Sequence, residues 1–205
     1  MVYKNFYLRL LFSFIFLIIY CLINYINFEF IFYLILFIYA ILILEIYFYF
    51  VKYKILPLIY ILISLTFFLN INFSNEFILN FNLYVFIVIF FDTFSYLTGK
   101  FYGKKKIINI SPNKTFEGLL GGIFISLISS ILFAIFFDIE INLQLFIFIV
   151  LIITSAFSGD IIESYFKRKN NLKNSSSLIP GHGGIFDRFD SFLFSIIFYS
   201  LSMSI

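Results

Sequence analysis

The residues best equipped for chemistry lie in one polar stretch, residues 159–190, of a chain that is otherwise almost continuously apolar. This stretch holds four carboxylates, a group of lysines and arginines, and the chain's only histidine. Asp160, Glu163, Ser164 and Lys167 are spaced i, i+3, i+4 and i+7, so they share one face if the preceding apolar helix continues through them. Two acids would then lie beside a cation that can bind phosphate.

A second acidic pair follows, because Asp187 and Asp190 repeat the i, i+3 spacing around Arg188. Glycines allow tight or left-handed turns that other residues resist, and three of them precede this pair: Gly181, Gly183 and Gly184. The pattern predicts a flexible loop that leads into the second pair of acids.

Both acidic pairs are unfavourable unless a cation accompanies them. Asp160 and Glu163 would oppose the dipole at the C-terminal end of their helix, and the second pair lies among apolar residues. Hard oxygen ligands with no nearby cysteine favour Mg²⁺, alone or with a second cation. Carboxylates, a metal and surplus cations are typical of phosphoryl or nucleotidyl transfer. His182 could act as an acid or base, or only hydrogen-bond a phosphate or a carbonyl.

The segment 111–118, SPNKTFEG, is a further candidate site. Helix amides, the hydroxyls and Lys114 could hold an anionic phosphate there, beside the carboxylate of Glu117. The alternative is an ordinary capped helix start. The chain contains no GxxxxGK[ST] motif, so it is not a P-loop enzyme.

Two further acids, besides Asp160 and Asp190, fall inside predicted spans. Asp92 lies about two helical turns from the end of its helix, where an ionisable group is costly and is a functional candidate. It could instead pair with a lysine of the following loop. Glu45 lies near the end of the second span, and we expect it to extend toward Lys52 rather than to have a function.

Composition predicts an integral membrane protein, because 62% of the 205 residues are hydrophobic and only 12% are charged. A membrane crossing takes roughly 20 helical residues. We therefore expect an all-α polytopic bundle of about seven transmembrane helices, over residues 10–23, 30–50, 55–69, 77–98, 118–137, 143–162 and 189–205.

Loop charges predict the orientation of these spans, because cytoplasmic loops collect lysine and arginine. All 14 basic residues fall before the first span or in alternate loops. The charged residues of the opposite loops are all acidic: Glu29, Glu76, Asp138 and Glu140. The N-terminus and two long basic loops are therefore expected in the cytoplasm.

The stretch SYFKRKNNLKNSSSLIPGHGGIFDRFD resembles the signature of CDP-diacylglycerol synthases, also called phosphatidate cytidylyltransferases. DTFSYLTGKFYGKKK and SPNKTFEG support the resemblance. It implies that a phosphate oxygen of phosphatidic acid attacks the α-phosphorus of CTP and releases pyrophosphate. Residues 92–205 would form the catalytic membrane region, and residues 1–91 a shortened set of N-terminal helices, within one membrane domain.

The resemblance also implies roles for individual residues. The expected catalytic residues are Asp160, Asp187, Lys167 and His182. The expected substrate-binding residues are Lys114, Glu117, Ser164, Arg168, Lys173, Arg188, Gly183 and Gly184. The expected metal ligands are Asp160, Asp187, Asp190, Asp92 and Glu163. The partners would be CTP, phosphatidic acid and membrane lipids, with no nucleic acid, and the family favours a homodimer in the inner or plasma membrane.

The signature is broken at one position, because the family usually has aspartate after the residue matching Lys173 and this chain has Asn174. An asparagine side chain cannot take a proton or contribute charge, so this position differs chemically from the family pattern. Three other functions remain open: a transporter, a non-catalytic membrane scaffold, and a related CTP-dependent transferase that acts on another lipid. The one-sided charge and the lack of an inverted repeat argue against the transporter.

Overall fold

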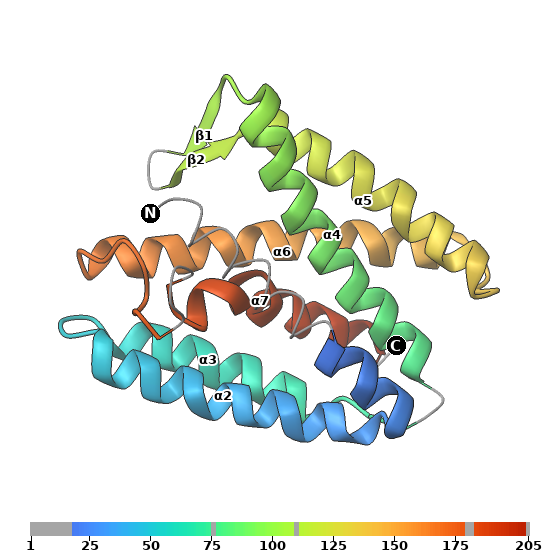
Figure 1. The fold of residues 1–205 in the computed structure, drawn as a ribbon, viewed down its shortest axis with the longest axis horizontal. Helices are drawn as coiled ribbons and strands as arrows, with labels where there is room; N and C mark the ends of the chain where they lie inside the picture. Colours follow the sequence, from blue (N-terminus) through green and yellow to red (C-terminus); the bar gives the residue numbers. More distant parts are fainter. Residues whose placement is uncertain (1–17, 75–76, 109–110, 179–182, 204–205) are drawn as a thin grey trace. The chain divides into compact units, whose positions relative to one another are not determined.

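The computed structural model describes residues 18–74, 77–108, 111–178 and 183–203, and these residues are mostly helical (Figure 1). After a short helical segment at residues 18–26, the helices are α2 (Glu29–Tyr49), α3 (Ile55–Leu69), α4 (Ile78–Tyr102), α5 (Phe116–Phe136), α6 (Leu143–Lys169) and α7 (Phe186–Met203). The predicted all-α class is confirmed.

Four helices are long and apolar enough to cross a membrane: α2, α4, α5 and α6. Helix α3 is also apolar but has only 15 residues, and α7 has 18 residues with charged side chains in its first turn. Most of the first predicted span lies outside the described residues. The chain is a polytopic membrane protein.

Several predicted bounds were wrong. Helix α4 runs to Tyr102 and α6 runs to Lys169, well past the expected ends of their spans, while α7 begins three residues earlier than expected, at Phe186. Hydrophobicity marks only the part of a helix in lipid, and these helices continue into polar sequence. The extension of α6 satisfies the condition for its acids and Lys167 to share a face.

A short hairpin precedes α5. Strands β1 (Lys106–Ile108) and β2 (Ser111–Thr115) pair antiparallel, with Lys106 opposite Thr115. Thr115 then caps α5, because its hydroxyl accepts a hydrogen bond from the Gly118 amide at 3.2 Å. The ordinary capped helix start is therefore present, and the strand before it was not predicted.

The chain divides into two compact units, which are described separately. Unit 1 comprises Met1–Thr66, Asn72–Ile78 and Phe166–Phe189, and unit 2 comprises Phe67–Ile71, Leu79–Tyr165 and Asp190–Ile205. The predicted functional division at residues 91 and 92 stays a prediction.

Unit 1 is built on the antiparallel pair α2 and α3, which lie side by side (Figure 1). Their buried hydroxyls on Tyr39 and Ser64 are hydrogen-bonded at 2.6 Å. Aromatic contacts join the start of α7 and the end of α6 to this pair. The rings of Phe50 and Phe186 are 6.1 Å apart and edge-on, and those of Tyr60 and Phe166 are 5.7 Å apart.

Unit 2 depends on small residues where helices meet. A Cβ on Gly118 would lie 2.8 Å from the Ser95 carbonyl oxygen, and one on Gly122 would lie 2.8 Å from the Ser95 Cβ. Helices α4 and α5 therefore approach through a small-xxx-small pattern, which is common between membrane helices. Likewise, a Cβ on Gly159 of α6 would lie 2.5 Å from the Asp190 carbonyl oxygen of α7.

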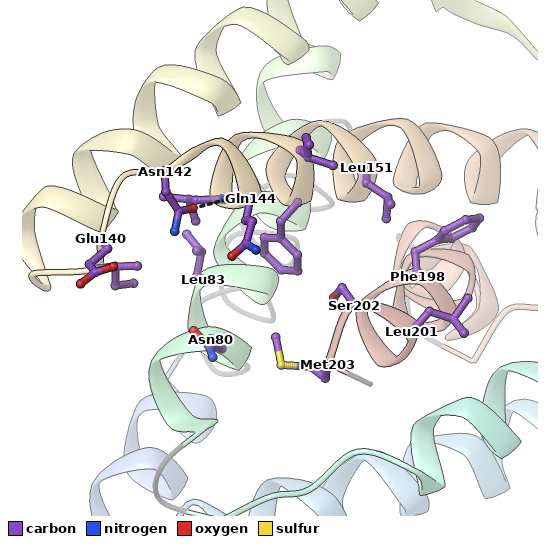
Figure 2. A pocket seen from close by; sticks show the side chains of 14 residues that line it. Asn80, Leu83, Glu140, Asn142, Gln144, Leu151, Phe198, Leu201, Ser202 and Met203 are labelled. Carbon is purple, nitrogen blue, oxygen red and sulfur yellow. Dashed lines mark hydrogen bonds between the residues drawn. The ribbon is translucent and has the colours of Figure 1, made fainter. Parts of the chain in front are cut away.

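A recess of about 690 Å³ lies in unit 2, between the N-terminal ends of α4 and α6 and the C-terminal end of α7 (Figure 2). Its lining mixes apolar side chains, such as Leu151 and Phe198, with polar ones, such as Asn80 and Gln144. None of the predicted site residues lines it. Along α4, Asp92 is nine residues beyond Leu83 of the recess, or roughly 14 Å at the helical rise.

Candidate active site

Three helices and the hairpin of unit 2 bring together four acids, one lysine and one serine. We call this group the acidic cluster; its members are Asp92 on α4, Lys114 on β2, Asp160 and Glu163 on α6, and Asp190 and Ser191 on α7. Gly159 permits the cluster, because its missing side chain lets the backbone of α7 come close to α6 beside Asp160.

The Ser191 hydroxyl joins two aspartates from different helices. Its oxygen lies 2.8 Å from Asp92 Oδ1 and 3.1 Å from Asp160 Oδ1. A hydroxyl has a single hydrogen to donate, so it satisfies one of these carboxylates at a time. Sequence reasoning missed Ser191, because a serine beside an acid has no distinctive spacing.

Lys114 supplies the positive charge of the cluster. Its ammonium forms an ion pair with Asp160 Oδ2 and lies 5.4 Å from the centre of the Phe157 ring. Both charged side chains are 21% exposed, so the pair is partly shielded from water and reachable from it. The structure therefore places Lys114 beside an acid of α6, a contact that was not predicted, and its binding of a phosphate stays a prediction.

The acids outnumber this cation. Asp190 is close enough to Asp160, Glu163 and Asp92 to interact with them electrostatically. The Glu163 side chain is only 1% exposed. Carboxylates this close together repel one another unless protons or cations offset their charge.

The cluster fits a hard divalent cation in the kind of donors it offers, since carboxylate and hydroxyl oxygens are the ligands that Mg²⁺ accepts. In the described part of the chain, however, no three acidic, histidine or cysteine side chains are already arranged around a point that could hold a metal. Lys114 is paired with Asp160 instead. The metal ligands stay a prediction.

Asp187 belongs to unit 1, where its carboxylate is already engaged. Asp187 Oδ1 accepts a hydrogen bond from the Lys167 ammonium at 2.7 Å, and their side chains are 8% and 13% exposed respectively. Asp187 Oδ2 accepts the amides of Ser175 at 3.0 Å and Gly184 at 2.9 Å. Asp187 and Lys167, two of the four predicted catalytic residues, therefore lie together, in contacts that also fix the loop before α7.

Glu45 also points at this loop, and the expectation that it would extend toward Lys52 was wrong. The Glu45 side chain is 1% exposed, and its Oε1 accepts the Ser175 hydroxyl at 2.5 Å. Its Oε2 accepts the amides of Ile185 at 2.9 Å and Phe186 at 3.1 Å. We name Glu45, Lys167, Ser175, Gly184 and Asp187 the loop anchor.

The glycines of this loop meet different requirements. Gly183 has φ +88°, the left-handed conformation that glycine adopts without strain, so the predicted left-handed turn is confirmed there. A Cβ on Gly184 would overlap Glu45 Oε1 and the Ser175 hydroxyl oxygen. Gly181 and His182 lie outside the described residues.

Most of the remaining predicted substrate-binding residues lie at the surface. Arg168 is exposed and donates to the Leu172 carbonyl at 3.0 Å. Lys173 and Arg188 are exposed, and Ser164 is half-buried. Asn174, where the signature is broken, is exposed.

The Glu117 carboxylate accepts hydrogen bonds from the backbone of the basic loop before the hairpin. Its Oε2 accepts the amides of Lys104 at 2.9 Å and Lys105 at 3.2 Å. This contact fixes the loop beside the start of α5. A direct contact between Glu117 and substrate stays a prediction.

The fold and the acidic cluster define a polytopic membrane protein in which carboxylates from three helices lie beside a partly exposed lysine. Comparison with known sequences assigns it more narrowly. The model of the cytidylyltransferase family matches residues 2–205, so the chain belongs to that family.

Three similar curated proteins are all named phosphatidate cytidylyltransferase. The one from Staphylococcus haemolyticus (strain JCSC1435) is 48% identical over 120 residues, which cover 57% of this chain and 46% of that protein. Those from Staphylococcus saprophyticus and Staphylococcus epidermidis are 48% and 43% identical over the same length and the same shares. The match spans about half the length of these relatives.

Proposed function

We propose that this protein transfers CMP from CTP to phosphatidic acid and so makes CDP-diacylglycerol and pyrophosphate. The observation that carries the proposal is the acidic cluster with its lysine, in a chain of the cytidylyltransferase family whose relatives are named for this reaction. A membrane protein with such a cluster is suited to join a lipid phosphate to a nucleotide.

In the proposed reaction, a phosphate oxygen of phosphatidic acid attacks the α-phosphorus of CTP. The bond from that phosphorus to the bridging oxygen breaks, and pyrophosphate leaves with the electron pair. Because the attacking oxygen is already anionic at neutral pH, no strong base is needed. The protein's task is to hold two anions in line and to reduce their repulsion.

Lys114 is our candidate for the phosphate contact within the acidic cluster. Its ammonium is partly exposed and already paired with Asp160, so it can bind a phosphate oxygen while Asp160 keeps its orientation. Exposed cations of unit 1, Arg168, Lys173 and Arg188, are proposed to bind phosphates as well. Ser164, Gly183 and Gly184 remain proposed contacts of the substrates.

Mg²⁺ is the proposed cofactor, and Asp92, Asp160 and Asp190 are the residues that would hold it, with Glu163 beside them. When bound, it would neutralise charge on the phosphates during transfer. Asp187 remains a proposed ligand, although its two oxygens are engaged with Lys167 and backbone amides. A cytoplasmic orientation of the site and a homodimer also belong to this proposal.

The proposal is tested with the purified chain in lipid nanodiscs, supplied with CTP, Mg²⁺ and phosphatidic acid. We expect pyrophosphate and a CMP-bearing lipid in equal amounts, and no product when the metal is chelated. Asp160→Asn should lower kcat by about 100-fold or more, as expected for an electrostatic contribution of about 3 kcal/mol. The exposed acid Asp138, changed to asparagine, is the matched control and should leave kcat unchanged.

Two results would overturn the proposal. One is a wild-type protein that is folded but releases no pyrophosphate with phosphatidic acid. The other is release of pyrophosphate only when a different lipid acceptor, such as a lipid alcohol, is supplied. The second result would favour the related CTP-dependent transferase.

A further inference from the structure

The start of α7 is capped by a carboxylate that lies more than a hundred residues away in the sequence. The first amides of a helix have no partner within the helix, and the amides of Ile185 and Phe186 both donate to Glu45 Oε2 on α2. An acid at a helix N-terminus is favourable, because it interacts with the positive end of the dipole.

The other oxygen of Glu45 fixes the preceding loop. Glu45 Oε1 accepts the Ser175 hydroxyl, and the Ser175 amide donates to Asp187 Oδ2. One serine therefore connects the two carboxylates. Glu45 and Ser175 are each 1% exposed, so water does not compete for these hydrogen bonds.

Gly184 is packed tightly against Glu45 and Ser175. Its amide donates to Asp187 Oδ2 at 2.9 Å, while the space where a side chain would stand is filled by Glu45 Oε1 and the Ser175 hydroxyl. The glycine is thus required by the position of Glu45, and the loop, the serine and the acid fit together as one unit.

We infer that Glu45 is a positioning residue for the proposed transfer reaction, on which this inference rests. Glu45 hydrogen-bonds to Ser175, Ile185 and Phe186. It acts through Ser175 and the first amides of α7, which determine where Asp187 stands, and Asp187 in turn holds the Lys167 ammonium at 2.7 Å. Without Glu45, the loop and the Asp187–Lys167 pair lose their common support.

The test compares two substitutions of similar volume in the full-length protein in nanodiscs. Glu45→Gln keeps an acceptor for the α7 amides, and its amide group can donate to the Ser175 oxygen. Glu45→Leu removes every acceptor. Glu29→Ala, at an exposed acid on the same helix, is the control and should behave as wild type.

The first readout is backbone hydrogen exchange, which does not depend on activity. In Glu45→Leu, the amides of residues 184–186 should exchange at least tenfold faster than in wild type, while those of α5 are unchanged. The second readout is kinetic. Glu45→Leu should lower kcat about 100-fold with KM for CTP within threefold, whereas Glu45→Gln should stay within fivefold of wild type in both.

A purely stabilising role would lower the amount of folded Glu45→Leu protein and leave its kcat per folded molecule unchanged. That result overturns the inference, and so does protection of the α7 amides in Glu45→Leu. Equal damage in the two variants also overturns it, because glutamine retains an acceptor for the α7 amides. If the wild type lacks transferase activity while the exchange difference is present, the proposed function fails and the anchoring of the loop by Glu45 stands.

Discussion

At the scale of single residues, the hydroxyl of Ser191 has the most constrained position in the acidic cluster. It lies within hydrogen-bond distance of two carboxylates, Asp92 and Asp160, that belong to different helices. A hydrogen bond to a charged group contributes about 1.5–3 kcal/mol, so this small side chain can control how the two acids are oriented.

We predict that Ser191→Ala lowers kcat by about 10- to 100-fold, since each 1.4 kcal/mol lost corresponds to about tenfold in rate. The variant should remain folded, because alanine fits the same buried position. The control is Ser155→Ala, at a buried serine of α6 that donates only to the Ile152 carbonyl of its own helix. Equal activity of both variants would remove Ser191 from the site.

For Asp187, we make a separate prediction about the free energy of unfolding. Its ion pair with Lys167 is largely buried, and removing one partner of a buried pair costs about 3–5 kcal/mol because the other charge is left without compensation. Asp187→Asn should therefore lower the free energy of unfolding by about this amount, measured by denaturant titration in detergent.

A double variant separates this effect from chemistry at Asp187. Because Lys167→Met removes the charge left without its partner, it should recover part of the stability lost in Asp187→Asn. The control is Asp138→Asn, because Asp138 is exposed with φ +54°, a conformation that asparagine tolerates. Unchanged stability of Asp187→Asn would show that the pair does not support the fold.

At the scale of elements, the contact between α4 and α5 depends on glycine. Gly122 lies against Ser95, and an added Cβ would be 2.8 Å from the Ser95 Cβ and 3.0 Å from its Cα. The neighbouring hairpin carries Lys114, so the spacing of these helices also determines where the lysine of the acidic cluster stands.

We predict that Gly122→Ala lowers the free energy of unfolding by about 1–3 kcal/mol, the usual cost of overpacking. The helix preference of alanine over glycine opposes this by about 1 kcal/mol, so the net loss should fall at the lower end. Phe124→Leu on the same helix, where the side chain is 66% exposed, should change stability little. A stabilised Gly122→Ala variant would contradict the close approach of α4 and α5.

At the scale of the whole molecule, the alternation of charged loops predicts which ends of the helices face the cytoplasm. Lys105 lies in the basic loop before α5, and Glu140 lies in the acidic loop after it. Both residues are exposed. Helix α5, which separates them, is one of the four helices able to span a membrane.

Single cysteines at Lys105 and Glu140, in a Cys21→Ser background, should therefore react with a membrane-impermeant thiol reagent from opposite sides. In intact cells only the Glu140→Cys variant should be labelled, and permeabilisation should expose the Lys105→Cys variant. Cys21 must be replaced because it is exposed. Labelling of both variants from the same side would contradict the predicted orientation.

The sequence by itself determined the class of the protein, because membrane insertion depends on the length and composition of individual segments. It also predicted the shared face of the α6 acids, since i, i+3 and i+4 neighbours meet on any helix. The glycines before α7 indicated that a left-handed turn was possible there, and Gly183 adopts this conformation. In each case, the physical cause lies within a few residues along the chain.

The tertiary structure alone decided which distant groups meet. Glu45 reaches Ser175, and Ser191 reaches Asp92, across 130 and 99 residues of sequence respectively. No spacing rule predicts such pairs, because they depend on how closely helices pack. Gly159, for example, lets α7 approach α6 until Ser191 and Asp160 are within hydrogen-bond distance. Glu45, which the sequence analysis expected to have no function, is buried because it bonds to the loop before α7.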